Sequence, residues 1–352
     1  MTPRDRVIKS LMFACPDRAP RQLWNLPGVE IFRSEELARM RSLYPEDFGA
    51  AGVSYGSAIR STGSPYRKGR YTDEWGCVWE VFEEGVVGEI KSPILADWAA
   101  LDRLMPPREI FKADWSAADS ARASTDRFIL AGTSVRPFER MQFLRGTENL
   151  YMDMAWGDAR FLRLRSLLHD FFLEELSLWA ARDVEGISFM DDWGTQRALL
   201  ISPDMWREYY KPLYAEYARV IRGSGKFAFF HSDGNIESII PDLIEIGISA
   251  LNSQLFCMDI EGIARKFRGK ITFWGEIDRQ KILPFGSPED VRAAVRRVRA
   301  ALDDGTGGVI AECEWGNRDP FDNIAAVFSA WEEPRGDLPR DAGAAARGTP
   351  QA

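Results

Sequence analysis

The feature that most constrains the fold of this chain is an alternation of short apolar runs with longer amphipathic segments, which begins near residue 120. The apolar runs have the length of buried strands, and the segments between them have the length and periodicity of helices. The runs lie at 128–132, 186–190, 227–230, 250–252, 271–274 and 308–311, and helical segments lie at 203–222, 235–247 and 288–303. Strands that alternate with helices form parallel βαβ units, so the sequence predicts a parallel sheet covered by helices.

Residues that start and stop helices mark the ends of these segments. Pro203 and Pro288 each follow a serine, and a serine cap before proline is typical of a helix start. Gly247 stands where the segment 235–247 ends, a position that favours glycine. The helical segments are therefore separate elements, as a strand–helix repeat requires.

A closed eight-strand barrel accounts for this repeat more economically than an open sheet. The chain has 352 residues, of which 45% are hydrophobic, and (β/α)8 TIM barrels of this length form one domain. We therefore expect an α/β fold with a single barrel domain over residues 1–335. A first strand is expected at 22–24 and a helix at 34–45.

Two regions depart from the repeat. Residues 48–95 are rich in glycine and aromatic residues, and we expect an excursion of loops and hairpin strands that covers one end of the barrel. Residues 336–352 are rich in Pro, Gly, Ala and Arg with little apolar content, which predicts a disordered tail.

Composition excludes several classes of protein. The net charge of −8 opposes nonspecific binding to nucleic acid. No apolar run reaches the length of a membrane span, and the polar N-terminus has no signal core, so we expect a cytoplasmic protein. The four cysteines are widely spaced without a C-x-x-C pair, and a disulfide framework is not expected.

Polar residues follow the expected strands at the same end of each. The strand ends carry Asp191-Asp192-Trp193, His231-Ser232-Asp233, Asn252-Ser253-Gln254, Gly275-Glu276-Ile277-Asp278 and Glu312-Cys313-Glu314-Trp315. In a barrel of parallel strands the C-terminal ends meet at one mouth, where active sites lie. The sequence therefore predicts an active site at this mouth rather than ordinary loop polarity.

His231 is the strongest candidate for a residue that takes part in the chemistry of the site. It opens a glycine-containing loop beside Asp233, which favours a metal ligand or an acid–base group over a core histidine, whereas the only other histidine, His169, lies in a helical pattern and is expected to pack there. With two histidines in the chain, a metal site must also use Cys, Asp or Glu. His231, Asp233 and Cys313 would supply one donor of each type that zinc accepts, with a fourth position left for substrate.

Other residues near the expected mouth are candidates for catalysis or substrate binding. Asp192 and Glu276 are the candidate catalytic carboxylates; Glu276 and Asp278 are equally open to acid–base work, metal ligation or pairing with an arginine. The candidates for substrate binding are Trp75, Trp193, Gln196, Asn252, Asp278 and Trp315. For the tryptophans, packing in the core or under a lid is the alternative to an aromatic pocket wall.

Several stretches together resemble the uroporphyrinogen decarboxylase superfamily, and within it the branch of cobalamin-linked methyltransferases. They are His231-Ser-Asp-Gly-Asn-Ile236, Ile240-Pro-Asp-Leu-Ile-Glu-Ile-Gly247, Ile271-Thr-Phe-Trp-Gly275, Ile282-Leu-Pro-Phe-Gly286, Asp192-Trp-Gly-Thr-Gln196, Arg145-Gly-Thr-Glu-Asn-Leu150 and Pro16-Asp17-Arg18. The resemblance covers about residues 5 to 333. It implies a (β/α)8 barrel and, in the methyltransferase branch, zinc held by a His-x-Cys pair and a later cysteine.

The match to this zinc pattern is partial. His231 falls on the histidine and Cys313 on the later cysteine, but Asp233 stands at the position of the other cysteine. This departure suits a methoxylated substrate better than a thiol. Decarboxylases of the superfamily hold an anionic tetrapyrrole with an arginine-rich N-terminal motif, and Gln22-Leu-Trp-Asn25 stands where that motif is expected, which argues against porphyrin decarboxylation.

These expectations lead to one function and two alternatives. The first is a zinc-assisted methyltransferase that moves a methyl group between a small methylated substrate and a corrinoid protein or related carrier, in a chain that resembles barrels which often form homodimers. The second is a metal-free decarboxylase or lyase that uses Asp and Glu for acid–base chemistry. The third is a noncatalytic protein that binds a corrinoid or tetrapyrrole.

Overall fold

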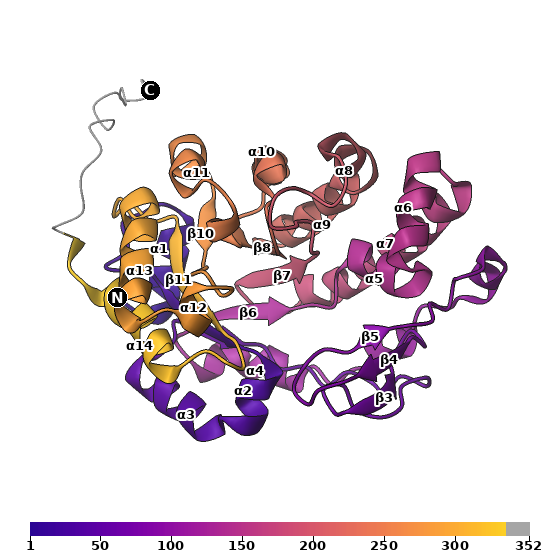
Figure 1. Ribbon diagram of the computed structural model, residues 1–352, viewed down its shortest axis with the longest axis horizontal. Coiled ribbons are helices and arrows are strands. Elements are labelled where there is room, and N and C mark those ends of the chain that lie inside the picture. Colours follow the sequence, from indigo (N-terminus) through magenta and orange to yellow (C-terminus); the bar gives the residue numbers. More distant parts are fainter. Residues whose placement is uncertain (336–352) are drawn as a thin grey trace.

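A computed structural model describes residues 1–335, so the tail expected at 336–352 lies outside the described residues. Eight parallel strands form a nearly closed barrel in the order β1-β11-β10-β9-β8-β7-β6-β2 (Figure 1). The strands are β1 (Arg21–Asn25), β2 (Phe48–Ala50), β6 (Phe128–Gly132), β7 (Gly186–Met190), β8 (Phe227–Ser232), β9 (Ala250–Ser253), β10 (Thr272–Trp274) and β11 (Val309–Trp315). The expected TIM-barrel fold is confirmed.

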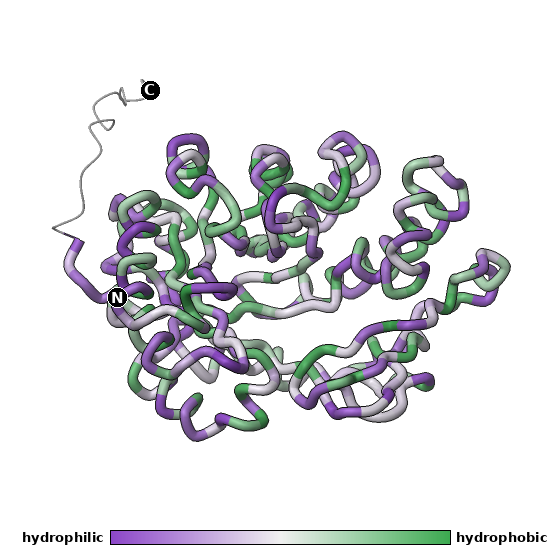
Figure 2. The backbone as a smooth tube through the Cα atoms, viewed as in Figure 1, coloured by the Kyte–Doolittle hydropathy of each residue, from purple (hydrophilic) through white to green (hydrophobic). Residues whose placement is uncertain are grey.

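Helices surround the barrel on the outside (Figure 1). They are α1 (Pro3–Leu11), α2 (Pro27–Phe32), α3 (Ser34–Leu43), α4 (Ser116–Ser124), α5 (Pro137–Arg145), α6 (Thr147–Trp156), α7 (Ala159–Ala180), α8 (Pro203–Tyr209), α9 (Lys211–Gly223), α10 (Ile240–Glu245), α11 (Ile260–Phe267), α12 (Ile282–Phe285), α13 (Pro288–Leu302) and α14 (Phe321–Glu332). In α11 the hydrophobic side faces the barrel and the hydrophilic side faces outward, which Figure 2 shows by colour. Such a stripe buries apolar area against the strands.

The predicted helix caps are present. The Ser202 side chain accepts from the Met205 N–H, and Ser287 and Asp290 form a capping box at the start of α13. The segment 203–222 is divided into α8 and α9 rather than continuous, and Pro212 stands in the first turn of α9. A proline fits there because the first turn needs no N–H donor for the helix.

Alternation along each strand separates the inside of the barrel from its outside. Phe128, Phe229, Trp274 and Ile310 belong to an interior cluster that α1 contacts with Val7. Residues of the other parity, among them Ile187, Phe230 and Cys313, belong to the larger core between the strands and the helices. Because both faces of a parallel strand are buried, both carry apolar residues.

The barrel is closed at the junction of β1 and β2 by Asp47 and Glu46 rather than by a regular ladder. The Asp47 N–H donates to the Arg21 carbonyl (2.9 Å), and its carboxylate accepts from the Arg21 N–H (2.7 Å). The Glu46 carboxylate accepts from the Leu23 N–H (3.1 Å). Side chains therefore satisfy backbone groups that a strand partner would otherwise satisfy.

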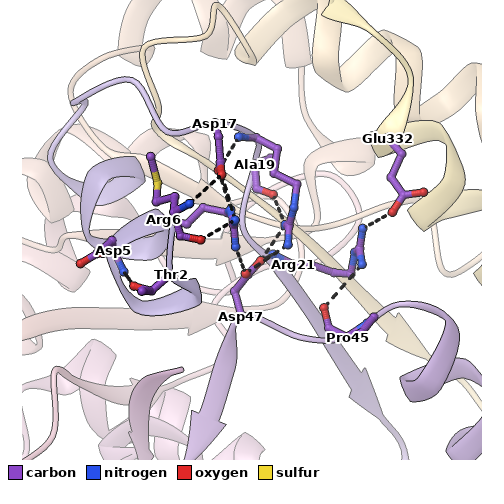
Figure 3. Close-up of polar contacts among 11 residues, drawn as sticks. Thr2, Asp5, Arg6, Asp17, Ala19, Arg21, Pro45, Asp47 and Glu332 are labelled. Carbon is purple, nitrogen blue, oxygen red and sulfur yellow. Dashed lines mark hydrogen bonds and ion pairs between the residues drawn. The ribbon is translucent and has the colours of Figure 1, made fainter. Parts of the chain in front are cut away.

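The Asp47 carboxylate is also the centre of an ion network at the N-terminus (Figure 3). It is 1% exposed and accepts from the guanidinium groups of Arg6 and Arg18. Arg6 also pairs with Asp17 (2.6 Å). The network fastens α1 and the following turn to the barrel.

The region 48–95 differs from the expectation in one respect. Its first residues form the barrel strand β2, and only the remainder is an excursion, which contains the antiparallel sheet β3 (Gly69–Thr72), β4 (Val78–Val81) and β5 (Glu89–Ile90). Trp79 of β4 packs on Phe143 of α5, and Trp75, in the turn between β3 and β4, packs on Phe171 of α7. Among residues 1–335, none of the helices has the length and apolar character that a membrane span needs.

Candidate metal and acid–base site

His231 lies at the C-terminal end of β8 and faces the interior of the barrel mouth. It shares the parity of Phe229, and its ring lies 5.5 Å from that of Trp24 on β1. Its Nδ1 atom lies 2.6 Å from Oδ1 of Asn252, which occupies the matching position on β9. Register between neighbouring strands therefore brings the two side chains together.

Two aspartates face the other ring nitrogen of His231. Its Nε2 atom lies 3.6 Å from Asp192 Oδ1, at the end of β7, and 3.5 Å from Asp233 Oδ1, in the loop after β8. The three donor atoms lie within 4.8 Å of one another. Within residues 1–335, this is the one group of three His, Cys, Asp or Glu donors so arranged.

The donor set fits a divalent metal ion. Two ligand atoms about 2.0–2.2 Å from one tetrahedral ion lie roughly 3.3–3.6 Å apart, which matches the two distances from His231. Asp233 Oδ1 is buried and has no hydrogen-bond partner within the described chain, and such an atom is costly unless a cation or a proton satisfies it. One imidazole nitrogen and two carboxylates suit zinc or another first-row divalent ion.

Arg279 balances part of the negative charge around this group. Its guanidinium pairs with the Asp233 carboxylate, lies 2.6 Å from Glu314 Oε1 and lies 3.7 Å from Glu276 Oε2. Asp233 thereby uses one oxygen for Arg279 and directs the other toward His231. Carboxylates outnumber the cations here, since Glu139 and Glu312 also surround the site.

Burial changes the acid–base properties of the site. Burial raises the pKa of Glu276 to about 7, although Arg279 opposes this, and burial together with the charge on Asp192 raises the pKa of Glu139 to about 7. Burial alone would lower the pKa of His231, but the charges on Asp192, Asp233 and Glu276 raise it overall. Groups that titrate near neutral pH are suited to proton transfer.

The raised pKa of Glu276 predicts that the free energy of unfolding of the metal-free protein depends on pH. The pKa of this carboxyl is raised from 4.5 to about 7 on folding, so the folded state favours the protonated form, and stability falls as pH rises between those values. The slope is at most about 1.4 kcal/mol per pH unit. Glu276→Gln removes the titration, so its free energy of unfolding relative to wild type should increase from pH 5 to pH 8. Urea denaturation at the two pH values measures this, and an unchanged difference would refute it.

A pocket beside the site opens to solvent and has an empty volume of about 380 Å³. Residues 196, 254–257 and 276–281 line it, so Gln196, Glu276 and Asp278 lie around one pocket, and their roles stay predictions. The Asp278 carboxylate also accepts from the N–H groups of Gln280 and Lys281, which fixes the turn. No residue of the excursion lines this pocket.

The structure does not bring Cys313 to the site. Cys313 alternates with Glu312 and Glu314 along β11, so its side chain lies on the opposite face, in the core between the strands and the helices. It is fully buried, and its thiol contacts the Glu314 carbonyl. The prediction that Cys313 is a zinc ligand is therefore wrong, because its thiol faces away from the site. Asp192 is the third donor beside His231 and Asp233.

The tryptophans proposed for substrate binding belong to the core. Trp193 is fully buried, stacks on Phe138 at 4.0 Å and donates to the Tyr214 hydroxyl. Trp315 is fully buried and donates to the Asp319 carbonyl, and Trp75 packs on α7 with 2% of its surface exposed. The expectation that these three tryptophans bind substrate is therefore wrong, and each of them packs in the core.

Asn252 is buried too, but it contacts the site through His231 rather than through the pocket. The sequence pattern places Glu312 and Glu314 at a strand end without indicating their role, and it does not identify Arg279, Glu139 or Trp24 as site residues. Glu139 lies in the first turn of α5, the helix that follows β6, and an acidic residue at the start of a helix on the mouth side of the barrel is a signal that could have found it.

Comparisons with known proteins identify the family of the chain. The family model described as Uroporphyrinogen decarboxylase (URO-D) matches residues 76–334. Among solved structures, a methyltransferase from Methanosarcina mazei is similar, with 13% identity, 94% of this chain and 98% of that chain covered, and a TM-score of 0.69. An endo-β-1,4-xylanase from Gloeophyllum trabeum is also similar, with 9% identity, 92% and 99% covered, and a TM-score of 0.45. A comparison with curated protein sequences finds no match. At 13% identity the first similarity shows a shared fold.

Proposed function

The chain belongs to the uroporphyrinogen decarboxylase family, and from the geometry of its site we propose that it is a metal-assisted methyltransferase. It would remove a methyl group from a small methylated substrate, such as a methoxylated compound, and pass it to a corrinoid held by a partner protein. The observation that carries the proposal is the convergence of His231 Nε2 with the Asp192 and Asp233 carboxylates at the barrel mouth. The cytoplasmic location and the homodimer remain predictions.

Asp192, His231 and Asp233 would hold the metal ion, which we take to be zinc. When bound, zinc supplies Lewis-acid chemistry that lowers the pKa of a coordinated hydroxyl or thiol. The chain's own residues prepare this site: Asn252 fixes the His231 ring, and Arg279 holds one oxygen of Asp233. The pocket between Gln196 and Asp278 would receive the substrate beside it.

Glu276 and Glu139 would donate the proton that the substrate oxygen takes up during methyl transfer. When the methyl group leaves a substrate oxygen, that oxygen keeps the bonding electron pair and takes up a proton. Both carboxyls have a pKa of about 7, so at neutral pH each is partly protonated and can donate. Glu276 lines the pocket, which makes it the first choice for this role.

The charge of the site argues against a multiply anionic tetrapyrrole as substrate. Asp192, Asp233, Glu276 and Glu314 face the mouth, and Arg279 is already paired with three of them. A carboxylate-rich substrate would therefore meet like charge without a free arginine in this group.

A metal-free decarboxylase or lyase is the second candidate. The raised pKa of Glu276 and Glu139 favours it, since two carboxyls that titrate near neutral pH can act as acid and base without a metal. Metal content separates the two candidates, because only the methyltransferase needs the ion.

Variants of Asp192 and Cys313 test which residues hold the metal. Asp192→Ala should lose the ion, because it removes a donor atom 3.6 Å from His231 Nε2. Cys313→Ala should retain it, because the thiol lies in the core on the other face of β11. Elemental analysis of the purified variants measures both, and loss of metal in Cys313→Ala with retention in Asp192→Ala would overturn the assignment.

The reaction itself is tested with free cob(I)alamin and a panel of methoxylated and methylated compounds. The proposal predicts that at least one compound converts the cobalamin to its methylated form, which is followed by absorption. The Asp192→Ala variant should fail with the same compound. Release of carbon dioxide from a carboxylated compound without cobalamin methylation would favour the decarboxylase instead.

A further inference from the structure

The side-chain amide of Asn252 is held by three groups below the candidate metal site. Its Nδ2 atom donates to the Trp274 carbonyl (2.6 Å) and to Glu312 Oε2 (3.1 Å), and its Oδ1 atom lies 2.6 Å from His231 Nδ1. Asn252 is fully buried and Glu312 is 1% exposed. Water therefore does not compete for these hydrogen bonds.

These contacts settle which way the amide points. The Trp274 carbonyl can only accept a hydrogen bond, and Glu312 Oε2 accepts beside it, so these two acceptors together turn the NH₂ group toward them and Oδ1 toward His231. His231 must then donate from Nδ1, which leaves the lone pair of the neutral ring on Nε2. That lone pair points to the side where Asp192 and Asp233 lie.

Glu312 takes up the second N–H of the amide. Its Oε2 atom accepts from Asn252, and its Oε1 atom has no hydrogen-bond partner within residues 1–335. The carboxyl lies against the backbone of Gly275, where a Cβ would overlap it. The carboxyl of Glu312 is thus packed in place and bonded to Asn252.

We propose that Glu312 is a positioning residue, which acts through Asn252 to hold His231 in the Nδ1–H tautomer with Nε2 free for a metal ion. The benefit of this tautomer rests on the proposed metal function. The test does not, because the tautomer is measured in the metal-free chain. Without Glu312, one buried N–H of Asn252 loses its acceptor, and the NH₂ group keeps a single acceptor, the Trp274 carbonyl. Loss of such an outer contact typically lowers metal affinity about 10- to 100-fold.

The test is the tautomer of His231 in the metal-free full-length chain, measured by NMR after labelling histidine with ¹⁵N. The chain has two histidines, so His169 serves as an internal reference, and the signal of His231 is assigned by its loss in His231→Ala. Spectra are recorded over a series of alkaline buffers, and the tautomer is assigned where the ¹⁵N shifts no longer change with pH. The variants are Glu312→Leu, Glu312→Gln and, as a matched control, Cys313→Ala, the next residue on the opposite face of β11.

We expect wild type to show the Nδ1–H tautomer and Glu312→Leu to show a mixture of tautomers. Glu312→Gln should resemble wild type, because its amide oxygen can still accept from Asn252, and Cys313→Ala should be unchanged. Zinc affinity should fall about 10-fold in Glu312→Leu and less than that in Glu312→Gln. A wild-type tautomer in Glu312→Leu, or an equal shift in Cys313→Ala, would overturn the proposal. If wild type binds no metal, the proposed function fails while the tautomer still decides the role of Glu312.

Discussion

Replacement of His231 by alanine is expected to lower the affinity for a divalent metal by more than about 100-fold, because even the loss of an outer contact costs about 10- to 100-fold. His231 supplies the one nitrogen donor of the group, and its Nε2 atom lies within 3.6 Å of both aspartates. Without His231, Asp192 and Asp233 leave only two protein ligands for an ion that prefers four. Competition with a chromogenic chelator measures the change.

His169→Ala is the matched control for this prediction. His169 lies on α7, where its ring contacts the Tyr217 hydroxyl and the Glu216 carboxylate, and it does not belong to the metal group. Its loss should leave metal affinity within about twofold of wild type, since it touches no donor. Equal losses in the two histidine variants would mean that His231 acts through stability rather than as a ligand.

Replacement of Asp47 by alanine should destabilise the fold by about 3–5 kcal/mol, the range for removing one partner of a buried ion pair. The buried carboxylate accepts from Arg6, from Arg18 and from the Arg21 N–H at the junction of β1 and β2. Its loss leaves the Arg6 charge without one of its two carboxylate partners and opens the closure of the barrel. Urea denaturation followed by circular dichroism measures the free energy of unfolding.

Glu332→Ala tests whether the large destabilisation expected for Asp47→Ala comes from the burial of the Asp47 carboxylate. Glu332 pairs with Arg21 in the same region (Figure 3), but its side chain is 52% exposed. Exposed pairs contribute about 0–1 kcal/mol, so this variant should cost far less than Asp47→Ala. Similar losses in both variants would contradict the role assigned to Asp47 in closing the barrel.

The strands were predictable where they are apolar and flanked by polar turns. The run 128–132 matches β6 and the run 186–190 matches β7. The strand β2, by contrast, has three residues, Phe48-Gly49-Ala50, and two of them are small. Its pairing with β6 comes from tertiary context, which a short stretch of sequence does not reveal.

The site was predictable to the extent that strand ends converge. His231, Asp233, Asp192 and Glu276 do meet at one mouth, because parallel strands end on the same side. The face of each side chain was harder to predict. On β11, the alternation of Glu312 and Glu314 with Cys313 does indicate that the thiol faces away from the glutamates, but the preceding apolar residues Val309 and Ile310, both buried, do not show which of the two faces is the interior.

The tryptophans show a second limit of prediction from sequence, which is whether an aromatic residue lines a pocket or packs in the core. Trp193 follows the site residue Asp192 directly, in the loop after β7, yet its side chain lies on the opposite side, where it meets Phe138 and Tyr214. A large aromatic beside a polar cluster is consistent with either a pocket wall or the core. Only the packing of α5 and α9 on that side decides between them.

The central claim, that Asp192, His231 and Asp233 form a metal site, is tested most directly by elemental analysis of the purified full-length chain, before and after supply of zinc. We predict about one divalent ion per chain, as one three-donor group implies. A chain that holds no metal even after zinc is supplied would contradict the claim, and the acid–base chemistry of Glu276 and Glu139 would then be the basis of function.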